Sequence, residues 1–272
     1  AFFKIFNSDG KSSSSIALAI PDDPTRTINM SWDPKIAMLA NGNIVATWHN
    51  NQKSYFQIFN SSGAAVKGME NARLLSKYWT QDAFIKTLSD GSFLVSWSGD
   101  TGKYYPQWVS YVQKFDSQGN ALESAKRICP NSGGPQHSPT ITELSNGNFL
   151  VTNITLGGVK YSGYYATVYD STFSSIISNN KFNATIPRYI TDMIIDAKAL
   201  ENGTFSLAWY NPSGKYEYAQ YSSKGIALSN NQILSMAIKT SVIFSGNYFN
   251  DTLSRYRAYT NTNSSYLTVA SN

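Results

Sequence analysis

Four acidic residues lie where the chain could supply carboxylates for glycoside hydrolysis. Asp33, Asp82, Glu143 and Asp196 each fall near the start of the first predicted strand of a repeated unit. Glycosidases use two carboxyl groups across a cleft, one as the acid and one as the base or nucleophile. The four residues together do not share one position relative to the leucines that mark the units, so a glycosidase site built from them is only a minor alternative.

Metal and nucleophile chemistry have little support in the residue types. The chain has one cysteine, Cys129, and two histidines, His49 and His137, which do not form a pair with zinc-ligand spacing. Calcium needs several closely spaced oxygen ligands, whereas Asp90 and Asp100 stand alone and are expected to cap their own turns. No Gly-x-Ser-x-Gly motif is present. We therefore expect no catalytic residue, no metal and no cofactor, and a buried Cys129.

Aromatic residues gather in the segments that join the second and third predicted strands of the units. Exposed aromatic rings can stack on sugars while neighbouring Asn and Ser bind hydroxyl groups. Packing of the same rings within the fold or at a subunit contact is the alternative. The sugar-binding candidates are Tyr104, Tyr105, Trp108, Tyr161, Tyr164, Tyr210 and Tyr216.

Sequons for N-glycosylation are scattered along the chain, and two of them fall in predicted turns, where a glycan can project without disturbing a strand. The candidate sites are Asn29, Asn60, Asn153, Asn183, Asn202, Asn250 and Asn263.

The elements that must position these residues follow from one recurring phrase. It begins Leu-x-Asn/Asp-Gly at Leu39, Leu88, Leu144 and Leu200 and continues into a β-branched and aromatic strand that ends at Trp48 in the first copy. Asn-Gly between two strands suits a type I′ hairpin turn. A third strand, a glycine turn and a weaker fourth strand follow, and no stretch has helical periodicity.

Repeats of this length with four short antiparallel strands predict an all-β, propeller-like array of about five blades. We expect one repeat domain over 1–272, with a half-repeat at 1–32, repeats at 33–81, 82–137, 138–191 and 192–240, and further strands at 241–272. Trp48, Trp97 and Trp209 are expected to pack between blades. A solenoid or a sandwich is the alternative fold.

The two ends of the chain depart from the repeat. The first residues match the second half of a unit, and the last strand-rich stretch, 241–272, lacks the Leu-x-Asn-Gly phrase. The terminal strands are expected either to close a ring or to pair with another subunit. The third unit is also expected to be remodelled, because Asn153 replaces the tryptophan and Phe173 replaces the turn glycine.

The whole phrase, with the following Tyr-x-Gln-x-Phe-Asn/Asp-x-x-Gly, resembles the blade repeats of large extracellular, adhesin-like β-propeller proteins. The resemblance spans about Asp33 to Leu234 and the N-terminal half-repeat. It implies a secreted or cell-surface protein with a structural or binding role.

Composition agrees with an extracellular globular protein. Of the 272 residues, 14% are charged and 14% are aromatic, and the net charge of +5 comes from scattered residues rather than a basic stripe. We therefore expect no nucleic-acid partner, and no membrane span because no long apolar run occurs. The leading expectation is a non-enzymatic, glycosylated structural or adhesive protomer of a fibre or surface layer. A lectin-like propeller and a glycoside hydrolase are the alternatives.

Overall fold

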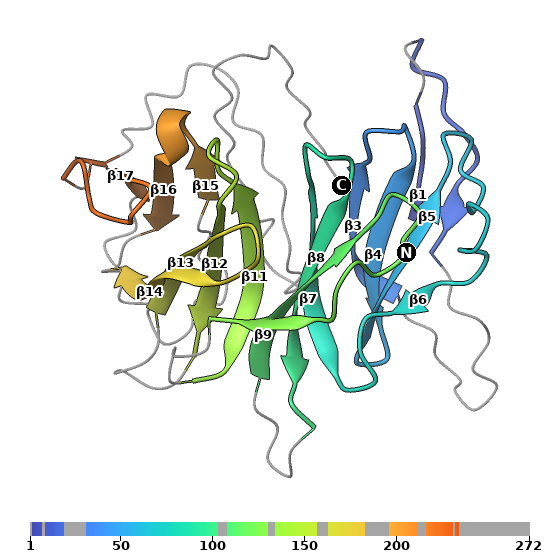
Figure 1. Ribbon diagram of the computed structural model, residues 1–272. Helices are drawn as coiled ribbons and strands as arrows, with labels where there is room; N and C mark the ends of the chain where they lie inside the picture. Colours follow the sequence, from blue (N-terminus) through green and yellow to red (C-terminus); the bar gives the residue numbers. More distant parts are fainter. Residues whose placement is uncertain are drawn as a thin grey trace.

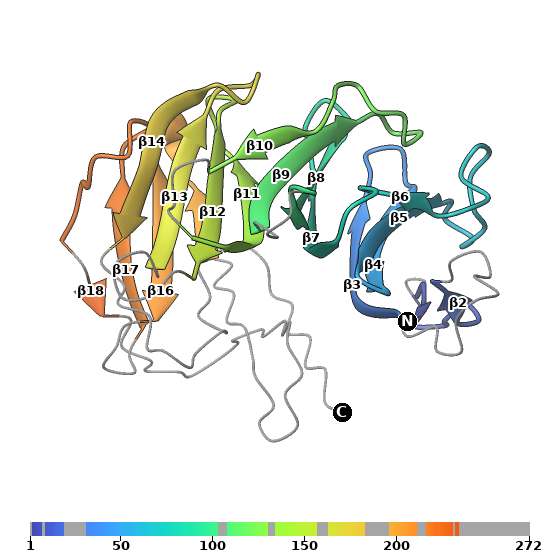
Figure 2. The same ribbon diagram turned by 90° about the horizontal axis from the view of Figure 1, so that it is seen from below.

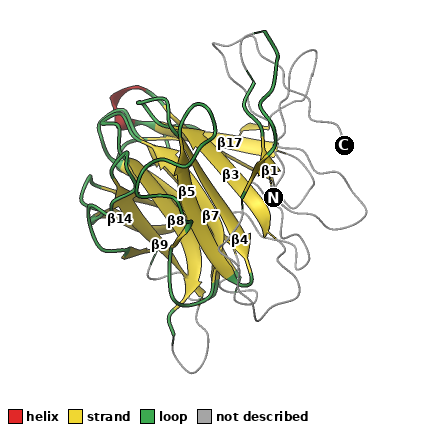
Figure 3. Cartoon of the chain, turned by 90° about the vertical axis from the view of Figure 1, so that its right-hand side faces the viewer, coloured by secondary structure: helices red, strands yellow, loops and turns green. Residues whose placement is uncertain are grey.

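The computed structural model describes residues 2–6, 9–18, 31–102, 108–129, 134–156, 163–182, 196–210, 216–230 and 232–233. These residues form four four-stranded antiparallel sheets and one two-stranded sheet, which confirms the predicted all-β, propeller-like array of blades (Figure 1). Apart from one short helical turn, Glu201–Gly203, the described chain consists of strands and the loops that join them (Figure 3).

Each blade is a meander in which the first strand is innermost and the fourth outermost. The first blade contains β3 (Ser31–Met38), β4 (Ile44–Asn50), β5 (Lys53–Phe59) and β6 (Arg73–Leu74), and the second contains β7 (Thr80–Thr87), β8 (Phe93–Asp100), β9 (Trp108–Phe115) and β10 (Lys126–Ile128). The third contains β11 (Gln136–Glu143), β12 (Phe149–Thr155), β13 (Gly163–Tyr169) and β14 (Ser175–Phe182), and the fourth contains β15 (Asp196–Ala199), β16 (Phe205–Tyr210), β17 (Tyr216–Tyr221) and β18 (Gln232–Ile233). The two-stranded sheet pairs β1 (Phe2–Phe3) with β2 (Ile16–Ala17).

The blades follow one another along an arc that begins at β1 and β2 and ends at β15 to β18 (Figure 2). The innermost strands β3, β7, β11 and β15 are neighbours in that order. Antiparallel pairing within each blade therefore brings the starts of the first and third strands and the end of the second strand to one face. The Leu-x-Asn/Asp-Gly turns lie at the opposite face.

The turns differ from the expected type I′ geometry in three of the four blades. In the first three blades only the turn glycine has positive φ, at Gly42, Gly91 and Gly147. In the fourth blade both Asn202 and the glycine after it have positive φ. The preceding side chain explains the difference, because Asn41 Oδ1 accepts the Asn43 N–H at 3.0 Å and holds the turn without positive φ. Asp90 and Asp100 cap their turns in the same way, as expected.

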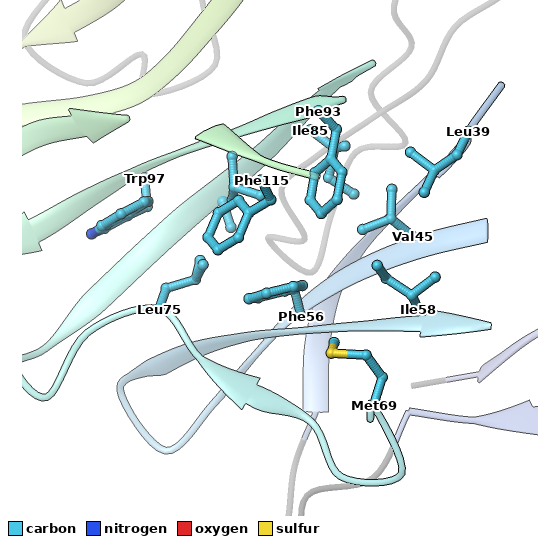
Figure 4. Packing of buried hydrophobic residues seen from close by; sticks show 12 residues of the cluster. Leu39, Val45, Phe56, Ile58, Met69, Leu75, Ile85, Phe93, Trp97 and Phe115 are labelled. Atoms are coloured by element: carbon cyan, nitrogen blue, oxygen red, sulfur yellow. The ribbon is translucent and has the colours of Figure 1, made fainter. Parts of the chain in front are cut away.

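Apolar side chains fill the interfaces between successive blades. Between the first and second blades, Val45, Phe56 and Ile58 pack against Phe93, Val95 and Phe115 (Figure 4). Trp48, Trp97 and Trp209 are all buried, with 0%, 2% and 3% of their surface exposed, which confirms their expected packing role. A four-stranded sheet with apolar residues on both sides is stable only when neighbours cover both sides.

The N-terminal half-repeat packs as half a blade against the first full blade. Phe3 and Leu18 are buried against Ile44, Trp48 and Phe59, and the rings of Phe3 and Phe59 meet edge-on at 5.2 Å. The expected strands at 241–272 lie outside the described residues, so ring closure and self-association through terminal strands stay predictions.

Cys129 is fully buried between the second and third blades. Burial raises the pKa of its thiol to about 12, so the thiol stays protonated at neutral pH. No helix in the described part of the chain is long and apolar enough to cross a membrane.

Candidate functional site

Three successive innermost strands are interrupted by the same irregularity near their starts. Pairing with the second strand shifts between Trp32 and Lys35 in β3, between Gln81 and Phe84 in β7, and between His137 and Thr140 in β11. Within each shift one residue has positive φ: Asp33 at 50°, Asp82 at 55° and Ser138 at 49°. Bulges of this kind re-aim side chains and are common beside active sites.

The three bulge residues occupy equivalent places in their blades. Asp33 precedes Leu39 by the same interval by which Asp82 precedes Leu88 and Ser138 precedes Leu144. The four candidate carboxylates together do not share a register, as expected, but Asp33 and Asp82 do, whereas Glu143 and Asp196 stand elsewhere. Proline inside a strand marks an edge or a bulge, so Asp33-Pro34 and Ser138-Pro139 are the sequence signals that could have revealed the site.

The two aspartates differ in their accessibility and in their partners. The Asp82 side chain is 6% exposed, and its Oδ2 accepts the Ser138 N–H from the next blade at 3.1 Å. The Asp33 side chain is 29% exposed and forms an ion pair with Lys35. Asp82 is therefore held between two innermost strands, whereas Asp33 is the carboxylate that a molecule outside the protein can reach.

His49 lies near the end of β4 and is paired in the sheet with Trp32, the residue before Asp33. The residue is 8% exposed, and burial lowers the pKa of its imidazole. The negative charges of Asp82 and Asp33 and a hydrogen bond to the Thr80 backbone act in the opposite direction.

His137 connects Asp82 to the third blade and to an aromatic ring. Its Nδ1 lies 2.8 Å from Gln81 Nε2 and 3.8 Å from Asp82 Oδ2. The Trp108 ring stacks on the imidazole, with centroids 6.1 Å apart and planes at 28°. Asp82, His137 and Trp108 thus form one cluster, with Asp33 at the equivalent bulge of the adjacent innermost strand, and these groups are able to exchange protons and to contact a sugar ring.

The structure places the candidate sugar-binding aromatics in different environments. Trp108 is partly exposed at the start of β9, beside this cluster. Tyr164 is fully buried between the third and fourth blades, so its ring belongs to the core. Tyr210 and Tyr216 form the last pair of the β16–β17 ladder, and Tyr104, Tyr105 and Tyr161 lie outside the described residues.

The candidate glycosylation sites are also divided. Asn60 and Asn202 lie in turns at the face opposite the cluster, and the Asn60 side chain caps its own turn. Asn153 is 1% exposed within β12, so a glycan there would have to disrupt the packed sheet. Asn29, Asn183, Asn250 and Asn263 lie outside the described residues.

The remaining carboxylate candidates do not occupy a bulge position. Glu143 ends β11 at the opposite face, where its Oε1 accepts the Ser89 hydroxyl at 3.1 Å, and Asp196 begins β15. Within the described ranges, no three or more His, Cys, Asp and Glu residues form a group that could hold a metal ion.

No protein-family model matches the chain, and no curated protein matches it by sequence. Solved structures do match. The GH93 α-L-arabinofuranosidase of Fusarium graminearum, in complex with arabinobiose, aligns with a TM-score of 0.51 at 12% identity, covering 86% of this chain and 70% of the enzyme.

Two enzymes of Bacteroides thetaiotaomicron also match. The endo-arabinase aligns with a TM-score of 0.45 at 14% identity, and the alignment covers 77% of this chain and 82% of the enzyme. The endo-1,4-β-xylanase aligns with a TM-score of 0.46 at 10% identity, and the alignment covers 75% of this chain and 77% of the enzyme. At these identities the likeness shows the fold alone.

These comparisons correct two expectations from the sequence. The leading expectation of a non-enzymatic structural or adhesive protein is wrong, and the resemblance to adhesin-like proteins is not supported. The propeller array on which both rested matches the fold of the GH93 arabinofuranosidase. The blade repeat itself is consistent with these structures, because turn and packing residues define a blade whatever its function is.

Proposed function

We propose that this protein is an extracellular carbohydrate-active enzyme that hydrolyses glycosidic bonds at the cluster formed by Asp33, Asp82 and His137. The observation that carries the proposal is the shared bulge, which brings Asp33 and Asp82 to equivalent places on adjacent innermost strands. The fold it shares with an arabinofuranosidase agrees with this reaction class. The extracellular location rests on the weakly charged, hydroxyl-rich composition.

Glycoside hydrolysis requires one group that accepts a proton from water, or attacks directly, and another that protonates the leaving oxygen. Asp33 suits the first role, because it is the more exposed carboxylate. His137 Nδ1 lies 3.8 Å from Asp82 Oδ2, and we assign this pair the role of proton donor. Water adds to the anomeric carbon and gives a proton to Asp33, while the bond to the leaving oxygen breaks and that oxygen takes a proton from the Asp82–His137 pair.

The test is hydrolysis of a broad panel that includes arabino-, xylo- and galacto-oligosaccharides, with Asp33→Asn and Asp82→Asn beside the unchanged protein. We expect each variant to lose about 100-fold or more in kcat, the usual effect of removing an acid or a base. Asp116→Asn is the matched control, because Asn60 holds the equivalent turn in the first blade. Lack of hydrolysis across the panel, or full activity in both site variants, would overturn the proposal.

A further inference from the structure

A row of three side chains crosses the second blade at the face that carries the cluster. Asp100, at the end of β8, pairs with Trp108 at the start of β9, and the Asp100 N–H donates to the Trp79 carbonyl at 2.9 Å just before β7. The order across the blade is therefore Trp79, Asp100, Trp108. We call these three residues the Trp–Asp–Trp row.

The row faces the third blade. Residues directly opposite each other in an antiparallel sheet project to the same side. Trp108 shows which side this is, because its ring stacks on His137 of the third blade. With strands about 4.8 Å apart, the two tryptophans stand ~10 Å apart, with the carboxylate between them.

Exposure and local structure both favour a ligand for this row. Trp79 is 47% exposed, unlike the buried tryptophans of the repeat, Trp48 and Trp97. Asp100 Oδ1 accepts the Gly102 N–H at 3.1 Å, which fixes the carboxylate in place. The neighbouring Tyr78 ring fills the space where a Gly102 side chain would stand, so Tyr78 packs directly against this turn residue.

The chemistry of the row matches a sugar chain. An indole ring offers a broad apolar face to the C–H groups of a sugar, and an ionised carboxylate accepts hydrogen bonds from hydroxyl groups. Two rings flanking one carboxylate can hold two or more consecutive sugars, whereas a single sugar needs only one ring. The row is also continuous with the cluster, because Trp108 contacts His137 and His137 lies beside Asp82.

We propose that the Trp–Asp–Trp row binds a carbohydrate chain that extends outward from the cluster, so that the substrate is an oligosaccharide or polysaccharide rather than a single terminal sugar derivative. The part of this inference that concerns the substrate of a reaction rests on the proposed function. Its binding part can be tested without any catalytic activity.

The kinetic test uses Trp79→Ala, because Trp108 also supports His137 and its removal would disturb the cluster. With oligosaccharides of two to six sugars from the hydrolysed series, we expect kcat/KM to fall about tenfold for the longest, a loss of about 1.4 kcal/mol. For the disaccharide we expect a change of less than about twofold. Phe6→Ala is the control, because Phe6 is an aromatic residue that is 65% exposed on the half-blade, away from the row. An equal loss at all lengths, or no loss at any length, would overturn the proposal.

The binding test is electrophoresis through native gels that contain arabinan, xylan or galactan. We expect at least one polysaccharide to retard the unchanged protein and the Phe6→Ala variant, and to retard Trp79→Ala much less. If hydrolysis is absent but the gels show this pattern of retardation, the proposed function is wrong and the proposal that the row binds carbohydrate is supported. If hydrolysis is present but Trp79→Ala behaves as the unchanged protein in both tests, the proposal that the row binds carbohydrate is wrong and the proposed function is unaffected. If light scattering gave a lower mass for Trp79→Ala than for the unchanged protein, Trp79 would belong to a contact between subunits, and this result would also overturn the proposal.

Discussion

At the scale of single residues, the candidate site depends on unusual backbone conformations. A non-glycine residue with left-handed φ costs roughly 1–2 kcal/mol, and Asp33, Asp82 and Ser138 all adopt it. At Asp82 the hydrogen bond from the Ser138 N–H helps to offset this cost and ties one blade to the next. Because three equivalent places adopt the same left-handed conformation, the surrounding blade must stabilise the bulge enough to offset its cost.

The charge of His49 gives a prediction on pH and stability. Burial lowers the pKa of His49 in the folded protein below 6.5, so the unfolded chain binds its proton more readily. The free energy of unfolding should therefore fall as the pH drops below 6.5, by up to about 1.4 kcal/mol for each pKa unit of depression. Urea denaturation between pH 5 and pH 8 measures this slope.

The matching variant is His49→Ser, since Ser98 occupies the equivalent place in the second blade. It should have a smaller decrease in stability between pH 6.5 and pH 5 than the unchanged protein, whatever its stability at pH 8. An identical slope in the two proteins would show that His49 does not control this dependence. The charges of Asp82 and Asp33 weaken the effect, because they favour the imidazolium.

At the scale of elements, the third blade keeps a turn whose glycine it has lost. Phe173 has φ of 60°, and its N–H donates to the Asp170 carbonyl at 3.0 Å, as the Gly119 N–H does to Asp116 in the second blade. The turn therefore keeps the backbone form of the other blades, whereas the strand after it, β14, departs from them, because its pairing with β13 shifts at two places. The Phe173 ring is buried and stacks on Phe149 at 4.9 Å, which offsets the backbone cost.

Two substitutions separate the ring from the backbone at this turn. Phe173→Ala should lower the free energy of unfolding by about 3–5 kcal/mol, because it removes the ring but keeps the unfavourable φ. Phe173→Gly should lower it by about 1 kcal/mol less, because glycine adopts this φ freely. Urea denaturation of both variants gives the order, and a less stable glycine variant would contradict this explanation.

The sequence predicted the elements better than it predicted the site. Strands, turns and the packing of Trp48 and Trp97 follow from local alternation and turn residues, which act over a few neighbours. The bulges do not follow from that pattern, because a shift in pairing changes the face of each later side chain without changing its type. The proximity of Asp82 to Ser138 depends on how blades pack together, which the repeat alone does not specify.

At the scale of the whole molecule, stability depends on every blade being covered by its neighbours. The half-blade formed by β1 and β2 covers Ile44 and Trp48 on the outer part of the first blade. On the same face but on the innermost strand, Ile36 and Met38 remain 54% and 70% exposed within the described structure. The N-terminal half-repeat thus covers the outer strands of this face and leaves its inner edge open.

Leu18→Ala tests whether the half-blade is an integral part of the fold. Leu18 is 2% exposed and packs in the cluster with Phe3 and Phe59, so its truncation leaves a cavity at the interface. We expect the free energy of unfolding to fall by about 2–5 kcal/mol, measured by urea denaturation at neutral pH. Leu122→Ala is the control, since Leu122 is 56% exposed and its loss should change stability by less than about 0.5 kcal/mol. Equal stability of the two variants would mean that the half-blade contributes little, and that the first blade is stable with one side uncovered.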